Sequence, residues 1–174
     1  MGRVTGDDSH VFLYIHDSYG SASLYRRIKM GAQKAKVNQY NGLESDLKNF
    51  AKIIFIYESK IKFYSKEIDF ETDFPNAFKL YKNNLQGFIK YATKNDIPNL
   101  LPCKTKTLYF TKTKNQVIDL CRHLRDSFSH ALLKRNGSHL MITNKSKGTI
   151  SSTGYLQHKS IMDFLKVMIT EYEQ

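Results

Sequence analysis

The sequence contains no tryptophan and only three prolines and two cysteines in 174 residues. The isolated cysteines, Cys103 and Cys121, have no metal-ligand spacing and indicate reduced thiols rather than a disulfide-stabilised secreted domain. No apolar run approaches the roughly 18 to 20 residues that a membrane-spanning helix needs. The N-terminus also lacks the basic-then-apolar layout of a signal peptide. We therefore expect a cytoplasmic protein that does not associate with membranes.

Acidic residues are also scarce. The chain has 16 of them against 27 Lys and Arg, a net charge of +11 and a pI near 9.6. The excess is concentrated in residues 103–147, where ten basic residues face only Asp119 and Asp126. A clustered positive field attracts polyanions. This pattern suits binding to nucleic acid or to an anionic membrane, and nucleic acid is favoured because the aromatic-rich helical stripes are expected to be used in the core. A role in solubility alone is the simpler alternative.

Hydrophobic periodicity predicts a mainly α-helical fold. Apolar residues recur at alternating spacings of three and four across residues 44–69 and again across 74–93, as in amphipathic helices. Pro75 suits the first turn of the second helix, with Asp73 as its N-cap. Two such helices in succession usually pack antiparallel in a bundle. A coiled-coil dimer is the competing interpretation.

The remaining pattern completes this expected bundle. Residues 95–112 are expected to be mostly loop, and a helix over 113–133 begins at a capping box formed by Thr113 and Gln116. The segments SHLMIT and TISSTGYL, with Gly148 at the turn between them, predict a β-hairpin. A closing helix follows over 159–172. The predicted fold is thus a helical bundle of 43–174 with one hairpin before the last helix. It is preceded by a segment, 1–42, of unknown role, for which packing on the bundle is one interpretation.

The helix over 113–133 carries groups suited to chemistry on a phosphodiester. At 100° per residue its apolar positions form one stripe, and Asp126, His130 and His123 fall on the opposite face. Arg125 lies between the two faces. Histidine exchanges protons near neutral pH, and a guanidinium stabilises charge on phosphoryl oxygens. The simpler interpretation is a solvated polar helix face.

The segment RDSFSH, from Arg125 to His130, resembles the R-x4-6-H signature of HEPN-domain proteins. The order of elements over residues 43–172 is also similar to that of HEPN proteins from prokaryotic defence systems and mobile elements. The resemblance implies a metal-independent endoribonuclease without cofactors, which dimerises through the motif helix to form a composite, positively charged cleft. Arg125 and His130 would then be catalytic, and Asp126 would help to orient them.

The resemblance leaves the regulator open. HEPN toxins that a partner nucleotidyltransferase neutralises have tyrosine two places after the histidine, where this chain has Leu132. A cognate antitoxin or other regulator is therefore a possible partner of unknown identity. The alternatives to an active ribonuclease are a non-cleaving HEPN-like module that binds nucleic acid or a partner, and an unrelated basic helical protein.

Further residues are candidates for RNA binding because they place cations and aromatic rings near the motif helix. Lysines can hold phosphates while an aromatic ring among them stacks on bases. An aromatic residue that anchors a loop on the core is the alternative for Tyr109. The candidates are Arg122, His123, Lys104, Lys106, Tyr109, Lys112, Lys134 and Arg135.

Overall fold

The structure is a computed structural model that describes residues 44–64, 67–97, 106–146 and 148–174. The predicted segment 1–42, together with Cys103 and Lys104, lies outside these residues. The helical elements are α2 (Glu44–Ile56), the π-helical turn η2 (Tyr57–Ile61), α3 (Phe70–Asp73), α4 (Pro75–Asn84), the 3₁₀ turn η3 (Gln86–Phe88), α5 (Gln116–Ser129) and α6 (His158–Tyr172). The strands are β1 (Ile89–Tyr91), β2 (Leu108–Phe110), β3 (Leu133–Asn136), β4 (His139–Ser146) and β5 (Thr149–Gln157).

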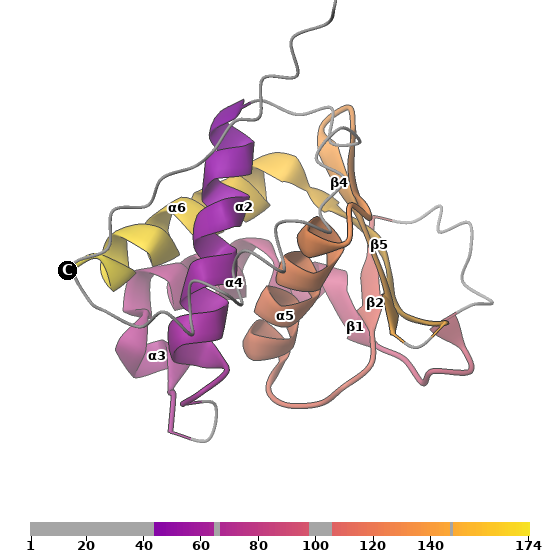
Figure 1. The fold of residues 1–174 in the computed structure, drawn as a ribbon, viewed down its shortest axis with the longest axis horizontal. Helices are drawn as coiled ribbons and strands as arrows, with labels where there is room; N and C mark the ends of the chain where they lie inside the picture. The colour runs from indigo at the N-terminus through magenta and orange to yellow at the C-terminus, as the bar shows by residue number, and fades with distance from the viewer. Residues whose placement is uncertain (1–43, 65–66, 98–105, 147) are drawn as a thin grey trace, which may run out of the picture.

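The fold is mixed α/β, so the prediction of a mainly helical bundle was wrong. In the described part of the chain, five strands form one sheet in the order β1-β2-β5-β4-β3. The first two strands are parallel, and the other neighbours are antiparallel. The helices gather on one side of this sheet, and α5 lies between α2 and the strands (Figure 1). The apolar core is therefore shared between helices and sheet rather than enclosed by a bundle.

The predicted helix over 74–93 ends early and is followed by a strand. Phe74 and not Asp73 is the N-cap of α4, and Pro75 occupies its first turn as predicted. The helix ends at Asn84, and β1 then pairs with β2 through Ile89 and Leu108. Two asparagines and Gly87 are poor helix formers, and a β-branched and an aromatic residue favour a strand. Phe88 and Ala92 fitted a helical spacing by coincidence.

The predicted helix over 44–69 is also interrupted. Regular α-helix ends at Ile56, and five residues of π-helix follow, to Ile61. Beyond this turn Phe63 and Tyr64 are exposed, although the periodicity placed Tyr64 in the core. Each π-helical turn shifts the angular position of the residues that follow it, which ends the continuous stripe.

The helix α5 begins later than predicted. Its N-cap is Asn115, whose side chain accepts a hydrogen bond from the Ile118 amide at 2.9 Å. Thr113 does not form the expected capping box, because its amide donates to the Asp119 carboxylate at 2.9 Å. At the other end the helix stops at Ser129, and Ala131 adopts a positive φ of 55°. The chain can then turn into β3.

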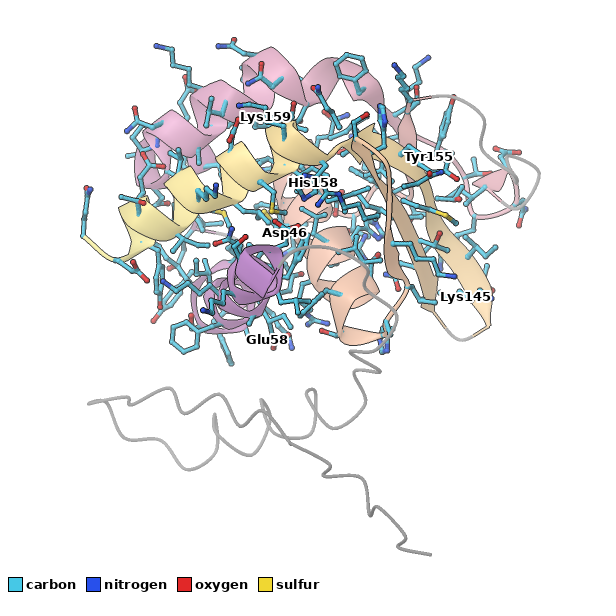
Figure 2. All side chains as sticks on the ribbon, turned by 90° about the horizontal axis from the view of Figure 1, so that it is seen from above. Asp46, Glu58, Lys145, Tyr155, His158 and Lys159 are labelled. Atoms are coloured by element: carbon cyan, nitrogen blue, oxygen red, sulfur yellow. The ribbon has the colours of Figure 1, made fainter. Side chains whose placement is uncertain are left out.

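The C-terminal elements lie where the sequence predicted them. β4 and β5 form an antiparallel hairpin with a bulge between Asn144 and Lys145, and Gly148 has a φ of +79°. The apolar residues of α6 are buried at the predicted spacing. His158 at the start of α6 bonds to Asp46 of α2 over 2.8 Å, which joins the two helices (Figure 2). The local pattern was sufficient here because each element buries one regular face.

Gly154 of β5 allows β2 to approach closely, which gives a stability prediction. Its φ is +146°, and a Cβ atom would overlap the Thr107 carbonyl and lie 2.7 Å from the Leu108 Cα. We expect Gly154→Ala to lower the free energy of unfolding by about 3 kcal/mol or more, because both the backbone conformation and the space oppose a side chain. Urea denaturation measures this change.

Gly87→Ala is the matched control, because a Cβ there meets nothing within 4 Å. It should change the free energy of unfolding by less than about 1 kcal/mol. Equal effects of the two substitutions would contradict the close approach of β2 to β5.

Candidate functional site around helix α5

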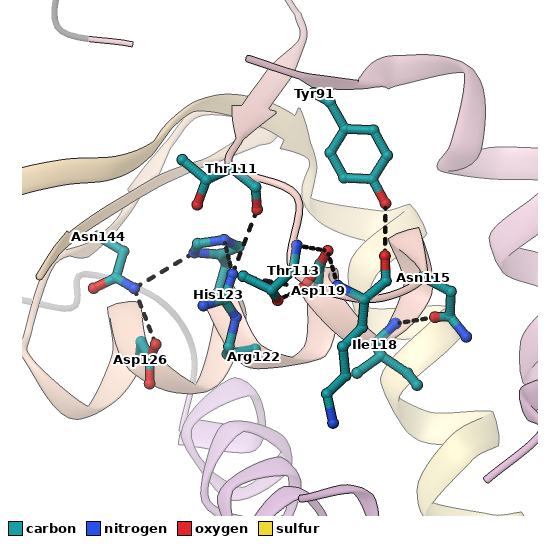
Figure 3. Close-up of polar contacts among 11 residues, drawn as sticks. Tyr91, Thr111, Thr113, Asn115, Ile118, Asp119, Arg122, His123, Asp126 and Asn144 are labelled. Atoms are coloured by element: carbon teal, nitrogen blue, oxygen red, sulfur yellow. Dashed lines mark hydrogen bonds and ion pairs between the residues drawn. The ribbon is translucent and has the colours of Figure 1, made fainter. Parts of the chain in front are cut away.

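The polar side of α5 faces the sheet instead of solvent. Asp119, His123 and Ser127 are spaced by four residues and are fully buried, so they lie on one face of the helix. The Ser127 hydroxyl donates to the Thr143 carbonyl of β4 at 2.8 Å. Asn144 of β4 donates to Asp126 at 3.0 Å (Figure 3). We call the group Asp119, His123, Asp126, Ser127 and Asn144 the polar seam.

Asp119 ties the preceding loop to the first turn of α5. Its carboxylate accepts from the amides of Thr113 and Lys114 at 2.9 and 3.1 Å and from the Thr113 hydroxyl. Arg122 lies 3.5 Å from the same carboxylate. A buried carboxylate near a helix N-terminus is stabilised by backbone amides and by the helix dipole. The loop that joins β2 to α5 is thereby held in place.

His123 is enclosed between α5 and the end of β2. Its ring stacks on Phe110 with centroids 4.9 Å apart, and its Nε2 lies 3.0 Å from the Arg122 guanidinium. Because a guanidinium only donates, Nε2 accepts from Arg122, and Nδ1 lies 3.4 Å from the Asn144 side-chain amide. Burial, with a smaller contribution from Arg122, lowers the pKa of His123 to about 3. The ring is therefore neutral near pH 7.

The helical-wheel prediction that His123 lies on an outer face was therefore wrong. The His123 imidazole is neutral and fully buried, and its Nε2 is bound to Arg122. A phosphate of RNA therefore cannot reach this ring in the structure. Arg122 is also tethered, by Asp119 and by the Thr111 carbonyl at 3.5 Å. Both residues hold α5 against the sheet.

Arg125 is clamped between α5 and the π-helical turn. Its guanidinium donates to the carboxylates of Glu58 and Asp126 and lies 5.0 Å from the centroid of the Tyr57 ring. Burial raises the pKa of Tyr57 to about 12, with an opposing contribution from Arg125. Lys62 also pairs with Glu58, at 2.8 Å. The π-helical turn thus supplies both an aromatic ring and a carboxylate that fix the orientation of Arg125.

Asp126 and His130 are not joined through their side chains. The carboxylate of Asp126 accepts from Arg125 and Asn144, whereas His130 contacts residue 126 through its backbone amide alone, at 3.0 Å. His130 is the C-cap of α5 and is exposed. Its ring makes no hydrogen bond or ion pair with the described residues. Asp126 therefore orients the predicted arginine but not the predicted histidine.

The other predicted RNA-binding residues are dispersed. Lys106, Lys112 and Lys134 are exposed, and Tyr109 is half-buried on β2. Arg135 of β3 lies 3.9 Å from Asp46 and donates to the Gly137 carbonyl at 3.2 Å. The two ends of α5 separate Lys112 from Lys134, because one residue precedes the helix and the other follows it. These residues do not form one continuous site.

Three residues of this region were not found from the sequence. Tyr57 fitted the apolar stripe of its helix, and Glu58 looked like one half of an ordinary surface ion pair, since a lysine lies one turn after it. Asn144 lies in the segment taken as the turn of the hairpin. No local signal relates any of them to α5, because the contacts cross 67 residues between Glu58 and Arg125 and 18 between Asn144 and Asp126.

Comparison of the chain with protein-family models, curated proteins and solved structures finds no match. Within the described residues, no helix combines the length and the apolar character needed to cross a membrane.

The buried His123 predicts a specific dependence of stability on pH. Between its ordinary pKa near 6.5 and the lowered value of about 3, the unfolded chain binds a proton that the folded chain excludes. The stabilisation should be complete above pH 6.5 and should be lost as the pH falls toward 3, by up to about 1.4 kcal/mol per pH unit. Urea denaturation at pH 7.5, 6 and 5 measures it.

His123→Gln should remove this part of the pH dependence, whereas His130→Gln, at the exposed end of α5, should retain it. An unchanged slope in His123→Gln would show that the ring is not excluded from protonation.

Proposed function

We propose that the protein is a metal-independent endoribonuclease that resembles HEPN proteins and acts through Arg125 and His130. The supporting observation is the state of its histidines. Of the four that the structure describes, His123, His139 and His158 contact polar side chains, and His130 has an exposed ring without such a contact. An exposed, unengaged imidazole at the end of a fixed helix is available for proton transfer.

The two residues would divide the work of phosphodiester cleavage. His130 would take the proton of the ribose 2′-hydroxyl, which then attacks the adjacent phosphorus and releases the 5′-oxygen. The products are a 2′,3′-cyclic phosphate and a 5′-hydroxyl. Arg125 would stabilise the charge that develops on the phosphoryl oxygens. Glu58 and Asp126 already bind its guanidinium, so a phosphate must displace one of these carboxylates to reach it.

Two copies of the chain are needed for this chemistry. The leaving 5′-oxygen requires a proton donor in addition to the base, and the described part of one chain offers one unengaged histidine. We propose a homodimer in which α5 of each copy contributes one His130, with RNA as substrate in the cytoplasm. A cognate antitoxin or other regulator would act on this dimer. Light scattering that shows a monomer at tens of micromolar would count against the proposed homodimer.

The first prediction of this proposal concerns His130. His130→Ala should reduce RNA cleavage by about 10²- to 10⁴-fold, the range that a general acid or base contributes. Because the side chain is exposed, the free energy of unfolding should change by less than about 1 kcal/mol. Leu124→Ala is the control, since Leu124 is fully buried in the core and its truncation should lower stability by about 2 to 5 kcal/mol.

Cleavage by His130→Ala at the wild-type rate would refute the proposed role of the histidine.

The second prediction concerns Arg125. Arg125→Gln should abolish detectable cleavage and should also lower the free energy of unfolding by about 1 to 3 kcal/mol, because Glu58 and Asp126 lose their shared cation. The helical wheel, which placed Arg125 between the two faces of the helix, did not predict this effect on the fold. Urea denaturation and an RNA cleavage assay on the same sample measure both effects, and wild-type stability would contradict the clamp around Arg125.

A non-cleaving module that binds nucleic acid or a partner is the second candidate. The observation that favours it is the neutralisation of Arg125 by two carboxylates, which leaves little positive charge for a substrate phosphate. RNA that stays intact but binds in a salt-dependent manner would support this candidate.

A further inference from the structure

The edge of the sheet formed by β1 and its flanking residues combines unpaired positive charge with exposed aromatic rings. Lys90, Lys94, Lys112 and Lys114 are all exposed, and none forms an ion pair with a carboxylate of the described residues. Among the described residues, four large hydrophobic side chains are exposed, and two of them, Phe88 at 51% and Tyr91 at 38%, lie here. We call these six residues the β1 edge.

Two acidic residues, Asp96 and Asp119, belong to the segments that form the β1 edge. Asp96 accepts a hydrogen bond from the Thr93 hydroxyl. Asp119 is fully buried and is bound by Thr113 and Lys114 amides. The four lysines of the β1 edge therefore outnumber the two carboxylates of these segments, of which Asp119 is buried.

Tyr91 is held where a base could stack on it. Its hydroxyl donates to the Lys114 carbonyl at 3.4 Å, as Figure 3 shows, and its ring packs edge-on against Phe110 with centroids 5.6 Å apart. The Lys112 ammonium lies 5.6 Å from the centroid of the Tyr91 ring. A stacking surface and a phosphate-binding cation are thus adjacent, as they are in proteins that bind single strands.

We propose that the β1 edge binds single-stranded RNA, with bases on Phe88 and Tyr91 and phosphates on the lysines. A duplex suits this surface poorly, because its bases are already stacked within the helix. The surface is separate from His130, since β2 leads into the start of α5 and His130 caps its end, about 20 Å away at 1.5 Å per residue. If the β1 edge does not bind RNA, the proposal of cleavage at His130 is therefore unaffected.

The test measures binding of a labelled 12-nucleotide oligouridylate by fluorescence anisotropy. The full chain carries His130→Ala, so that the RNA is not cut. Phe88→Ala with Tyr91→Leu should weaken binding about tenfold or more, because each stacked base contributes about five- to hundredfold. Tyr91→Phe should retain the affinity, and a melting temperature for each variant confirms that it folds.

The matched control is Phe63→Ala with Tyr64→Ala, which removes the other two exposed aromatic residues, at 62% and 56% exposure. It should leave the affinity within about twofold. Equal losses in the two double variants, or none in either, would overturn the proposal.

The lysines have their own control. Lys112→Gln with Lys114→Gln should lower the slope of log affinity against log salt by about 1.4, at about 0.7 per phosphate contact. Lys52→Gln with Lys159→Gln removes the same charge from lysines paired with Glu173 and Asp163 and should change the slope less. A 12-base-pair duplex that binds as tightly as the single strand would overturn the proposal. Lysine variants that lose binding to anionic vesicles but retain binding to RNA would also overturn it.

Discussion

The polar seam, which joins α5 to β4 and to the loop before the helix, is the interaction on which the other features depend. Removing one member of such a network leaves its partners buried and unpaired, which costs about 1 to 3 kcal/mol for each group. The seam fixes both the depth and the rotation of α5, because Ser127 and Asp126 bond to consecutive residues of β4. An apolar contact alone would tolerate small rotations of the helix. The hydrogen bonds do not.

This fixed rotation separates two kinds of side chain on one helix. His123 is enclosed and neutral, and Arg125 turns toward the π-helical turn, where Tyr57 and Glu58 meet it. His130 lies just beyond the last helical residue and stays exposed. In the proposed mechanism, the part of α5 that the seam holds would orient Arg125, and the exposed end would present His130 to the RNA. A partner copy or a regulator that approaches this end would meet His130 without disturbing the seam.

The sequence predicted those elements whose apolar periodicity matches one buried face. The β4–β5 hairpin and α6 are of this kind, and the existence of α5 was also predicted, though not its first residue. The face of α5 was misjudged because His123 and Asp126 look like a solvated stripe, and nothing near them in the sequence reveals that Asn144 will cover them. Similarly, Phe88 and Ala92 fit a helical spacing, and only the pairing of β1 with a strand 19 residues later shows otherwise. In both cases contacts with residues distant in the sequence determined the structure, and local propensity did not.

The most direct measurement of the central claim is incubation of the purified protein with total RNA in EDTA, followed by analysis of the ends of the products. The account predicts cleavage that persists in the chelator and leaves 2′,3′-cyclic phosphate and 5′-hydroxyl ends, because an imidazole and a guanidinium need no metal to promote attack by the 2′-hydroxyl. RNA that remains intact, or cleavage that stops in EDTA and leaves 5′-phosphate ends, would contradict it.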